Sequence, residues 1–227
     1  MIYFDKVSKV YLPGASPAVD GITLSIEPGE FVSIVGHSGA GKSTLLKMLF
    51  AEVFPTEGTV FFESQDIGTL SAKDLRNLRR NIGTVFQDFR LLPTKNIFEN
   101  IAFALEVAGK SDEDIQGDVP HVLDLVGLAD KMWNFPHELS GGEQQRIAIA
   151  RAIVNQPDVL IADEPTGNLD PVNAHDVVEI LKKINDLGTT ILLTTHNKSI
   201  VDSIGRRVVT MDRGRIIRDD VSGKYVL

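Results

Sequence analysis

Residues 36–44 read Gly-His-Ser-Gly-Ala-Gly-Lys-Ser-Thr and follow the apolar run Phe31–Val35. A strand that leads into G-x-x-x-x-G-K-[ST] and then into a helix is typical of a phosphate-binding loop. Its glycines let the backbone approach an anion, and its successive N–H groups form a concave nest at the positive end of the helix. This stretch therefore predicts an α/β fold that binds a nucleotide phosphate at the carboxyl end of the strand.

The residues of this loop divide into a backbone cradle and two side chains with tasks of their own. Lys42 is expected to place its ammonium group on the β- and γ-phosphates, and Ser43 to direct its hydroxyl at Mg²⁺. We assign no catalytic role to His37. The expected ATP-binding positions of the loop are Gly36, His37, Ser38, Gly39, Ala40, Gly41, Lys42, Ser43 and Thr44.

A second apolar run, Val159–Ala162, ends in the two carboxylates Asp163 and Glu164. Four consecutive apolar residues favour a strand that is buried in a parallel sheet. In open α/β sheets the ligand lies at the carboxyl ends of the strands, so both acids are expected beside the phosphate-binding loop.

A third string, Leu-Ser-Gly-Gly-Glu-Gln at 139–144, resembles the signature of ATP-binding cassette (ABC) ATPases. The resemblance runs over essentially the whole chain. It implies a P-loop NTPase (RecA-like) core with an antiparallel β edge and a helical insertion. We expect one domain at 1–227, with its core at 1–87 and 156–227 and a helical subdomain at about 88–155.

The resemblance implies roles for single residues as well. Asp163 matches the acid that holds Mg²⁺ through water, and Glu164 matches the general base for attack on the γ-phosphate. The remaining matches are Gln87 (a sensor of Mg²⁺ and the attacking water), His196 (a γ-phosphate contact), Tyr11 (an adenine-stacking aromatic) and Asp170 (the D-loop, in Gly-Asn-Leu-Asp at 167–170).

The signature predicts a protein that works in pairs. Ser140 is expected to cap a helix whose first residues, Gly141, Gly142 and Glu143, would face an anion. This helix belongs to the insertion and cannot fold back onto its own loop. A two-fold, head-to-tail dimer solves the geometry, because each signature then closes on the partner's ATP and two composite sites form. For Arg146 and Arg151, an ion pair and a contact to nucleotide remain equally open.

Composition excludes several classes of protein. With 31 acidic and 23 basic residues the net charge is −8, which disfavours a nonspecific grip on nucleic acid. The absence of cysteine excludes disulfides and thiolate metal sites. No apolar stretch reaches the roughly 18 residues of a membrane span. We expect a peripheral protein at the cytoplasmic face of the cell membrane, which it contacts only through a partner.

Within the ABC family the chain is most similar to the cell-division ATPases of the FtsE type. The string Val-Phe-Gln-Asp-Phe-Arg-Leu-Leu-Pro at 85–93 carries most of this resemblance. It implies a membrane partner resembling FtsX and an ATP-driven conformational change, passed across the membrane, that regulates cell-wall hydrolysis. Phe89, Leu91 and Leu92 could receive a helix of that partner, or Phe89 and Leu92 could belong to the core of the insertion.

The sequence leaves one alternative to the cell-division function. The ATPases of lipoprotein-releasing and macrolide-export transporters share the residues at 164–170, so this chain could be the ATPase subunit of such a transporter. A soluble ABC protein of translation or DNA repair is disfavoured, because the chain has one cassette and no heptad run.

Periodicity and turn residues predict the elements. Strands are expected at Ile2–Lys9, Ile22–Ile26, Val60–Phe62, Ile82–Phe86, Val159–Ala162, Thr190–Thr194, Arg207–Met211 and Arg215–Arg218. Helices are expected at Lys42–Ala51, Lys73–Arg80, Ile97–Val107, Val119–Val126, Gly142–Val154, Val172–Leu187 and Ser199–Ile204.

Overall fold

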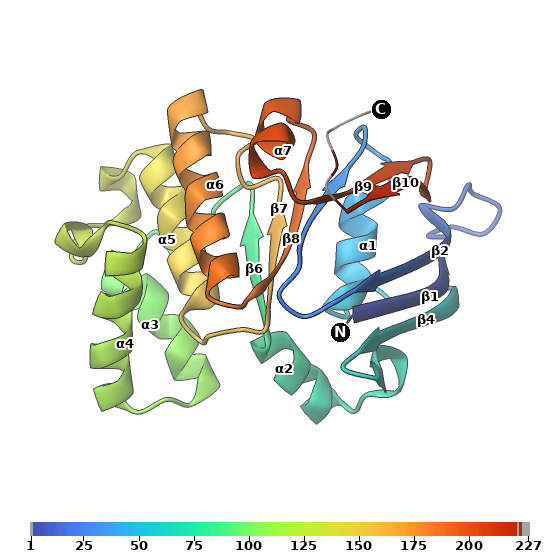
Figure 1. The fold of residues 1–227 in the computed structure, drawn as a ribbon. Helices are drawn as coiled ribbons and strands as arrows, with labels where there is room; N and C mark the ends of the chain where they lie inside the picture. The colour runs from blue at the N-terminus through green and yellow to red at the C-terminus, as the bar shows by residue number, and fades with distance from the viewer. Residues whose placement is uncertain (1, 222, 224–227) are drawn as a thin grey trace.

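Two β-sheets and seven α-helices make up the computed structural model, which describes residues 2–221 and 223. The strands are β1 (Ile2–Lys9), β2 (Val19–Ile26), β3 (Phe31–Val35), β4 (Glu57–Phe62), β5 (Gln65–Asp66), β6 (Ile82–Phe86), β7 (Val159–Asp163), β8 (Thr190–Thr195), β9 (Arg207–Asp212) and β10 (Arg215–Asp220). One sheet has the order β10-β9-β3-β8-β7-β6 and the other the order β2-β1-β4-β5 (Figure 1). In the six-stranded sheet only β10 runs antiparallel, and the four-stranded sheet is antiparallel throughout.

The helices separate into those of the core and those of an insertion. They are α1 (Lys42–Leu49), α2 (Ala72–Arg80), α3 (Ile97–Ala108), α4 (Asp112–Leu125), α5 (Gly141–Ile153), α6 (Pro171–Asp186) and α7 (Lys198–Ile204). Short 3₁₀ turns lie at Ile67–Thr69, Ala129–Lys131 and Pro136–Glu138. Between β6 and β7 the described chain contains helices and no strand, and α3, α4 and α5 stand together beside the six-stranded sheet (Figure 1).

Strand β8 shows how the six-stranded sheet is covered on both faces. Ile191 and Leu193 pack into a cluster with residues of α3, α4, α5 and α6. Leu192, which points the other way, packs into a second cluster with α1 and the four-stranded sheet. All residues of β8 are buried, as the alternation of side chains on a fully covered strand requires. The predicted fold class, a P-loop core with an antiparallel β edge and a helical insertion, is confirmed.

Helix α4 begins at Asp112, seven residues before the predicted start at Val119. Gly117 and Pro120 lie inside the helix and read as breakers in the sequence. The true start is marked by a capping box: Ser111 accepts from the Asp114 amide, and the Asp114 carboxylate accepts from the Ser111 amide. This box signals a helix start strongly enough to outweigh both breakers.

The predicted domain limits, residues 1 and 227, lie outside the described residues. The predicted inner boundaries, at 87/88 and 155/156, fall in the loops after β6 and before β7. A helix long and apolar enough to cross a membrane is not found in the part of the chain that the structure describes.

Candidate functional site

The loop between β3 and α1 turns through three glycines whose positive φ angles are rarely adopted by other residues. The φ angles of Gly36, Gly39 and Gly41 are 149°, 80° and 103°. A Cβ atom on Gly36 would lie 2.2 Å from the carbonyl oxygen of Met211. Gly41 precedes α1 and offers no side-chain cap, so the first amides of the helix remain available to an anion.

Lys42 is buried and aimed back across this loop. Its Nζ donates to the carbonyl oxygens of Gly36, at 2.8 Å, and His37, at 3.2 Å. The same nitrogen lies 3.8 Å from Oε1 of Glu164, and the lysine is 7% exposed. The ammonium group is therefore held by the loop at the point where a phosphate would meet the nest of amides.

Ser43 and Asp163 come together from the two strand ends that the sequence singled out. Ser43 Oγ donates to Asp163 Oδ1 at 3.2 Å. A hydroxyl and a carboxylate are hard oxygen donors, which Mg²⁺ prefers, and Mg²⁺ is usually held by few protein ligands together with water and substrate phosphates. These two residues fit the predicted Mg²⁺ site.

Glu164 follows directly and has a strained backbone. Its φ of 50° is uncommon for a residue with a Cβ, and such outliers concentrate at functional sites. Its Oε2 lies 2.9 Å from His196 Nδ1, and the His196 side chain is largely exposed. The carboxylate thus stands between the lysine of the loop and the predicted γ-phosphate histidine.

Gln87 approaches the same site from the end of β6. Its Nε2 donates to Asn168 Oδ1 at 3.0 Å, and Asn168 Nδ2 donates to the Gln87 carbonyl oxygen at 3.2 Å. Gly167 leaves space for this pair of hydrogen bonds, because a Cβ there would lie 2.9 Å from Gln87 Nε2. In this structure the amide of Gln87 is paired with the D-loop.

These elements enclose a cavity of about 660 Å³. Its walls are Ala18, residues 37–44, Gln87, Glu164 and His196. Tyr11 lies at its margin, 53% exposed, with its hydroxyl 3.4 Å from Thr44 Oγ1. None of the residues at 140–143 lines the cavity. One chain therefore gathers the predicted loop, acid, glutamine and histidine residues but leaves its own signature elsewhere.

The signature residues form the start of α5 and cap it themselves. Ser140 Oγ accepts from the Glu143 amide, and the Glu143 carboxylate accepts from the Ser140 amide at 2.8 Å. The hydrogen bond from that amide is the main cause that lowers the pKa of Glu143. Gly142 permits a close approach of α6, since a Cβ there would lie 1.9 Å from Asn173 Oδ1. By helix geometry the amides of Gly141 and Gly142 have no acceptor within α5.

Asp170 has a structural task at the start of α6. Its Oδ1 accepts from the backbone amides of Val172 and Asn173, at 3.0 and 3.1 Å. The side-chain amide of Asn173 bonds to the same carboxylate and is the main cause that lowers the pKa of Asp170. The predicted D-loop acid is thus the N-cap of a helix that packs against the signature helix.

The two arginines left open by the sequence have different partners. Arg146 lies 3.7 Å from Asp176, as an ion pair. Arg151 donates to the backbone carbonyl oxygens of Arg90, at 2.7 Å, and Phe89, at 3.0 Å. Through these two bonds Arg151 holds a turn in which Phe89 and Arg90 have φ of 56° and 51°. Burial lowers the pKa of Arg151.

The residues of that turn were predicted either to receive a partner or to belong to the core. Phe89 is half-buried and lies beside Gly141, outside all three hydrophobic clusters of the described residues. Leu91 packs against the cluster of the helical insertion, and Leu92 is half-buried.

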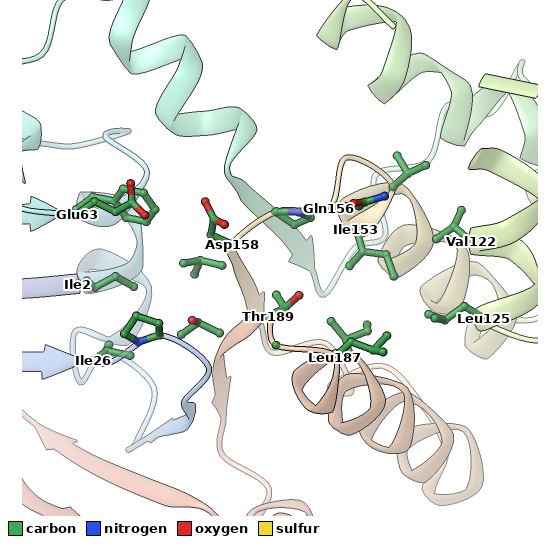
Figure 2. Close-up of a pocket in the computed structure, with 18 of the residues that line it drawn as sticks. Ile2, Ile26, Glu63, Val122, Leu125, Ile153, Gln156, Asp158, Leu187 and Thr189 are labelled. Carbon is green, nitrogen blue, oxygen red and sulfur yellow. The ribbon is translucent and has the colours of Figure 1, made fainter. Parts of the chain in front are cut away.

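A second cavity, of about 560 Å³, lies at the opposite ends of β7 and β8. Figure 2 shows Ile2 and Glu63 on one side and Leu125 on the other, with Asp158 between them. The charged residues of its lining are Glu27, Glu63, Asp118 and Asp158, with His121 beside them, and none of the described lining residues is Lys or Arg. These acidic groups would repel a phosphate group, which disfavours this second cavity as a nucleotide site.

Comparison with known proteins agrees with this geometry. The sequence profile of the ABC transporter family matches residues 19–167. The chain is 51% identical to the cell division ATP-binding protein FtsE of Bacillus subtilis (strain 168) over 225 residues, which cover 99% of this chain and 98% of the relative. It is 45% identical to FtsE of Escherichia coli (strain K12) over 216 residues, or 95% and 97% of the two chains.

Among solved structures, the chain resembles the ATP-binding cassette MJ0796 in a dimeric post-hydrolysis state bound to ADP and Pi. The TM-score is 0.87 at 34% identity, with 99% of this chain and all of the other covered. It also resembles cbiO1 of Clostridium perfringens, part of the transporter complex cbiONQ, with a TM-score of 0.89 at 31% identity over 97% of this chain and 88% of the other.

Proposed function

The chain belongs to the ABC transporter family, and from that membership we propose that it is the ATP-hydrolysing subunit of a bacterial cell-division complex. The observation that carries the proposal is the identity of about half of all residues, over nearly the full length, to proteins named cell division ATP-binding protein FtsE. The lipoprotein-releasing or macrolide-export alternative is not favoured by these relatives.

ATP is bound by the loop of one chain. Lys42 and the amides of the loop contact the β- and γ-phosphates, and Thr44 and Tyr11 border the nucleoside side. Ser43 would hold Mg²⁺ directly and Asp163 would hold it through water. The ion, when bound, draws charge from the phosphate oxygens. Support comes from the donor set of Ser43 and Asp163, whose oxygens lie 3.2 Å apart at the edge of the loop cavity.

Hydrolysis requires a water molecule aligned with the γ-phosphate. Glu164 accepts a proton from this water or orients it, and His196 contacts the γ-phosphate. Gln87 lines the same cavity, and in this structure its side-chain Nε2 donates to Asn168 of the D-loop. The proximity of Glu164 to both Lys42 and His196 supports these roles.

The composite site needs a second chain. Residues 140–143 do not line the loop cavity of their own chain, whereas the related cassette MJ0796 is dimeric in its post-hydrolysis state. We therefore assign Ser140, Gly141, Gly142 and Glu143 to the ATP of the partner in a two-fold homodimer, with Asp170 between the two sites. The positive end of α5 suits the γ-phosphate of that ATP.

The membrane partner is of the FtsX type and brings the protein to the cytoplasmic face of the membrane. The turn at 88–92 is the proposed docking surface, since it follows Gln87 and presents Phe89 outside the core. ATP binding and hydrolysis then change the shape of the complex and regulate cell-wall hydrolysis on the far side.

Co-purification tests the docking surface. Phe89→Ala is expected to lose the membrane partner from the complex while its melting temperature and basal hydrolysis stay close to wild type, since aromatic anchors can contribute about 2 kcal/mol or more to an interface. Phe103→Ala, which removes an exposed aromatic from α3, is the matched control and should retain the partner. If Phe89→Ala instead melts about 6–20 °C lower, its ring is core and the docking assignment fails.

A further inference from the structure

Thr194 is a fully buried residue of β8 that lies behind the two acids of the site. Strand register pairs it with Asp163 on β7 and with Ile34 on β3. Paired residues of neighbouring parallel strands point to the same face of the sheet, so the side chains of Thr194 and Asp163 lie side by side. Nothing in the sequence motifs singles this threonine out.

Its hydroxyl makes two hydrogen bonds, one to each acidic residue. Oγ1 donates to Asp163 Oδ1 at 2.5 Å and accepts from the Glu164 amide at 3.0 Å. A hydroxyl has a single proton, which Thr194 donates to the Asp163 carboxylate, and one of its oxygen lone pairs accepts from the Glu164 amide. Valine, of similar shape, could form neither bond.

The bond to Asp163 falls on the carboxylate oxygen that Ser43 also contacts. Ser43 Oγ donates to the same Oδ1, so within the described residues both hydroxyl bonds fall on one oxygen and none on Oδ2. The carboxylate is thereby fixed in rotation about its terminal bond. Such support behind a metal ligand sets its orientation and affects affinity for the ion.

The bond to Glu164 acts on the backbone. The Glu164 amide is shared between the Thr194 carbonyl oxygen, at 3.1 Å, and Thr194 Oγ1, at 3.0 Å. These bonds hold a residue whose φ is 50°, a conformation that persists only when its surroundings enforce it. The direction in which the Glu164 side chain leaves the strand depends on this backbone.

We propose that Thr194 is a positioning residue for hydrolysis: one hydroxyl orients the Asp163 carboxylate toward Mg²⁺ and holds Glu164 in the conformation that aims it at the attacking water. The inference rests on the proposed roles of Asp163 and Glu164. It adds a residue behind two acids, of which one is proposed to hold Mg²⁺ through water and the other to act on the attacking water.

The test compares Thr194→Val, Thr194→Ser, Thr190→Val and Asp163→Ala with wild type. Thr190 is a matched control, because it lies on β8, is buried and accepts a hydrogen bond from the Gly29 amide far from the site. Each protein is measured for kcat, for melting temperature, and for ATP affinity by titration in Mg²⁺ and in EDTA. The ratio of the two affinities reports on the metal site without turnover.

For Thr194→Val we expect kcat and the gain in ATP affinity given by Mg²⁺ to fall roughly 10- to 100-fold, the usual effect of removing support behind a metal ligand. ATP affinity in EDTA should be unchanged. Thr194→Ser keeps the hydroxyl and should restore both quantities, and Thr190→Val should leave both at the wild-type level. Should Thr194→Val fail to fold, Thr194→Ala removes the same hydroxyl and is expected to give the same result.

A Thr194→Val protein that matches Thr190→Val in kcat and in Mg²⁺ dependence would overturn the inference, as would a Thr194→Ser protein as impaired as Thr194→Val. Asp163→Ala separates this failure from that of the proposed function. If Asp163→Ala keeps wild-type kcat, the assignment of the acid itself is wrong. If Asp163→Ala is inactive and Thr194→Val is normal, only the role of Thr194 is withdrawn.

Discussion

The loop at 36–44 and the start of α5 are both built to face phosphate, yet they are built in opposite ways. Around the loop, one chain supplies a buried lysine and a histidine that both contact Glu164, and all three line one cavity. The start of α5 does not line this cavity, and its N-terminus is capped by its own residues Ser140 and Glu143. The first region is a pocket that a nucleotide can enter, and the second is a surface that must be brought to one. On the proposed dimer, binding then belongs to one chain and hydrolysis to two.

The largest effect is expected at the loop side, for Glu164→Gln. Removing a positioned general base typically slows a reaction about 10²- to 10⁴-fold, and ATP should remain bound because the lysine and the loop amides are untouched. Size-exclusion chromatography in Mg²⁺-ATP should show an ATP-held dimer. Glu63→Gln is the control, since Glu63 also ends a strand with a positive φ but lines the second cavity. Equal turnover by the two variants would remove Glu164 from the mechanism.

Lys42→Ala is expected to lose ATP affinity while the protein still folds. Loss of a charge-assisted contact to the phosphates is expected to weaken ATP binding on the order of 100-fold, because hydrogen bonds to charged groups contribute about 1.5–3 kcal/mol each. Titration with a fluorescent ATP analogue measures this. Lys47→Ala removes an exposed lysine from the same helix, where it pairs with Glu52, and should bind ATP as wild type does. Undiminished affinity in Lys42→Ala would contradict the assignment of the loop.

Gly141→Asp addresses the surface side of the comparison. A negative charge at the start of α5 would face the partner's γ-phosphate, and like charges across an interface cost several kcal/mol. We expect hydrolysis to fall about tenfold or more while the ATP affinity of the single chain stays within about twofold. Gly141→Ala adds a Cβ at ordinary contact distance, 3.8 Å from its neighbours, and should retain more activity. If Gly141→Asp weakens ATP binding to one chain, the two regions are not separate as described.

The smallest effect is expected for Ser140→Ala, on stability. Loss of an N-cap costs about 1 kcal/mol, or roughly 2–4 °C in melting temperature for a chain of this size. Glu143 has a pKa below its ordinary value of 4.5, so its contribution to the free energy of unfolding is present above that value and lost as pH falls through the lowered pKa. Only the part of the Ser140→Ala deficit that comes from the bond between Ser140 Oγ and the Glu143 carboxylate should be present at neutral pH and lost below about pH 4.5, because the bond from the Ser140 amide remains in the variant. Urea unfolding at several pH values measures it, and a deficit independent of pH would exclude a stabilising contribution from the bond between the two side chains.

Much of the site could be predicted because its residues lie where strands end. The loop after β3 and the acids after β7 are separated by about 120 residues in sequence, but the rule that parallel strands share a ligand edge brings them together. The same logic located Gln87 and His196 only with the help of the family resemblance, since a single polar residue after a strand carries little information alone.

What the sequence did not reveal depends on contacts between distant residues. Arg151 donates to the carbonyl oxygen of Phe89, 62 residues away in sequence, and Thr194 donates to Asp163, 31 residues away. No local sequence pattern predicts either hydrogen bond. Glu143 is different, because Ser-x-x-Glu is a capping box that can be read in the sequence. The family resemblance drew attention to the ligand role of this residue and away from its structural one.

The hydrogen bonds from Arg151 to the turn at 89–90 have a consequence for α5. The arginine lies eleven residues along α5 from Ser140, a length of roughly 16 Å of helix. Its guanidinium holds the carbonyl oxygens of the turn directly, while Phe89 of the same turn lies beside Gly141. The turn is thus braced against α5 near both ends of the helix, and on the proposed docking surface a partner would touch a segment that is tied to the whole length of the signature helix.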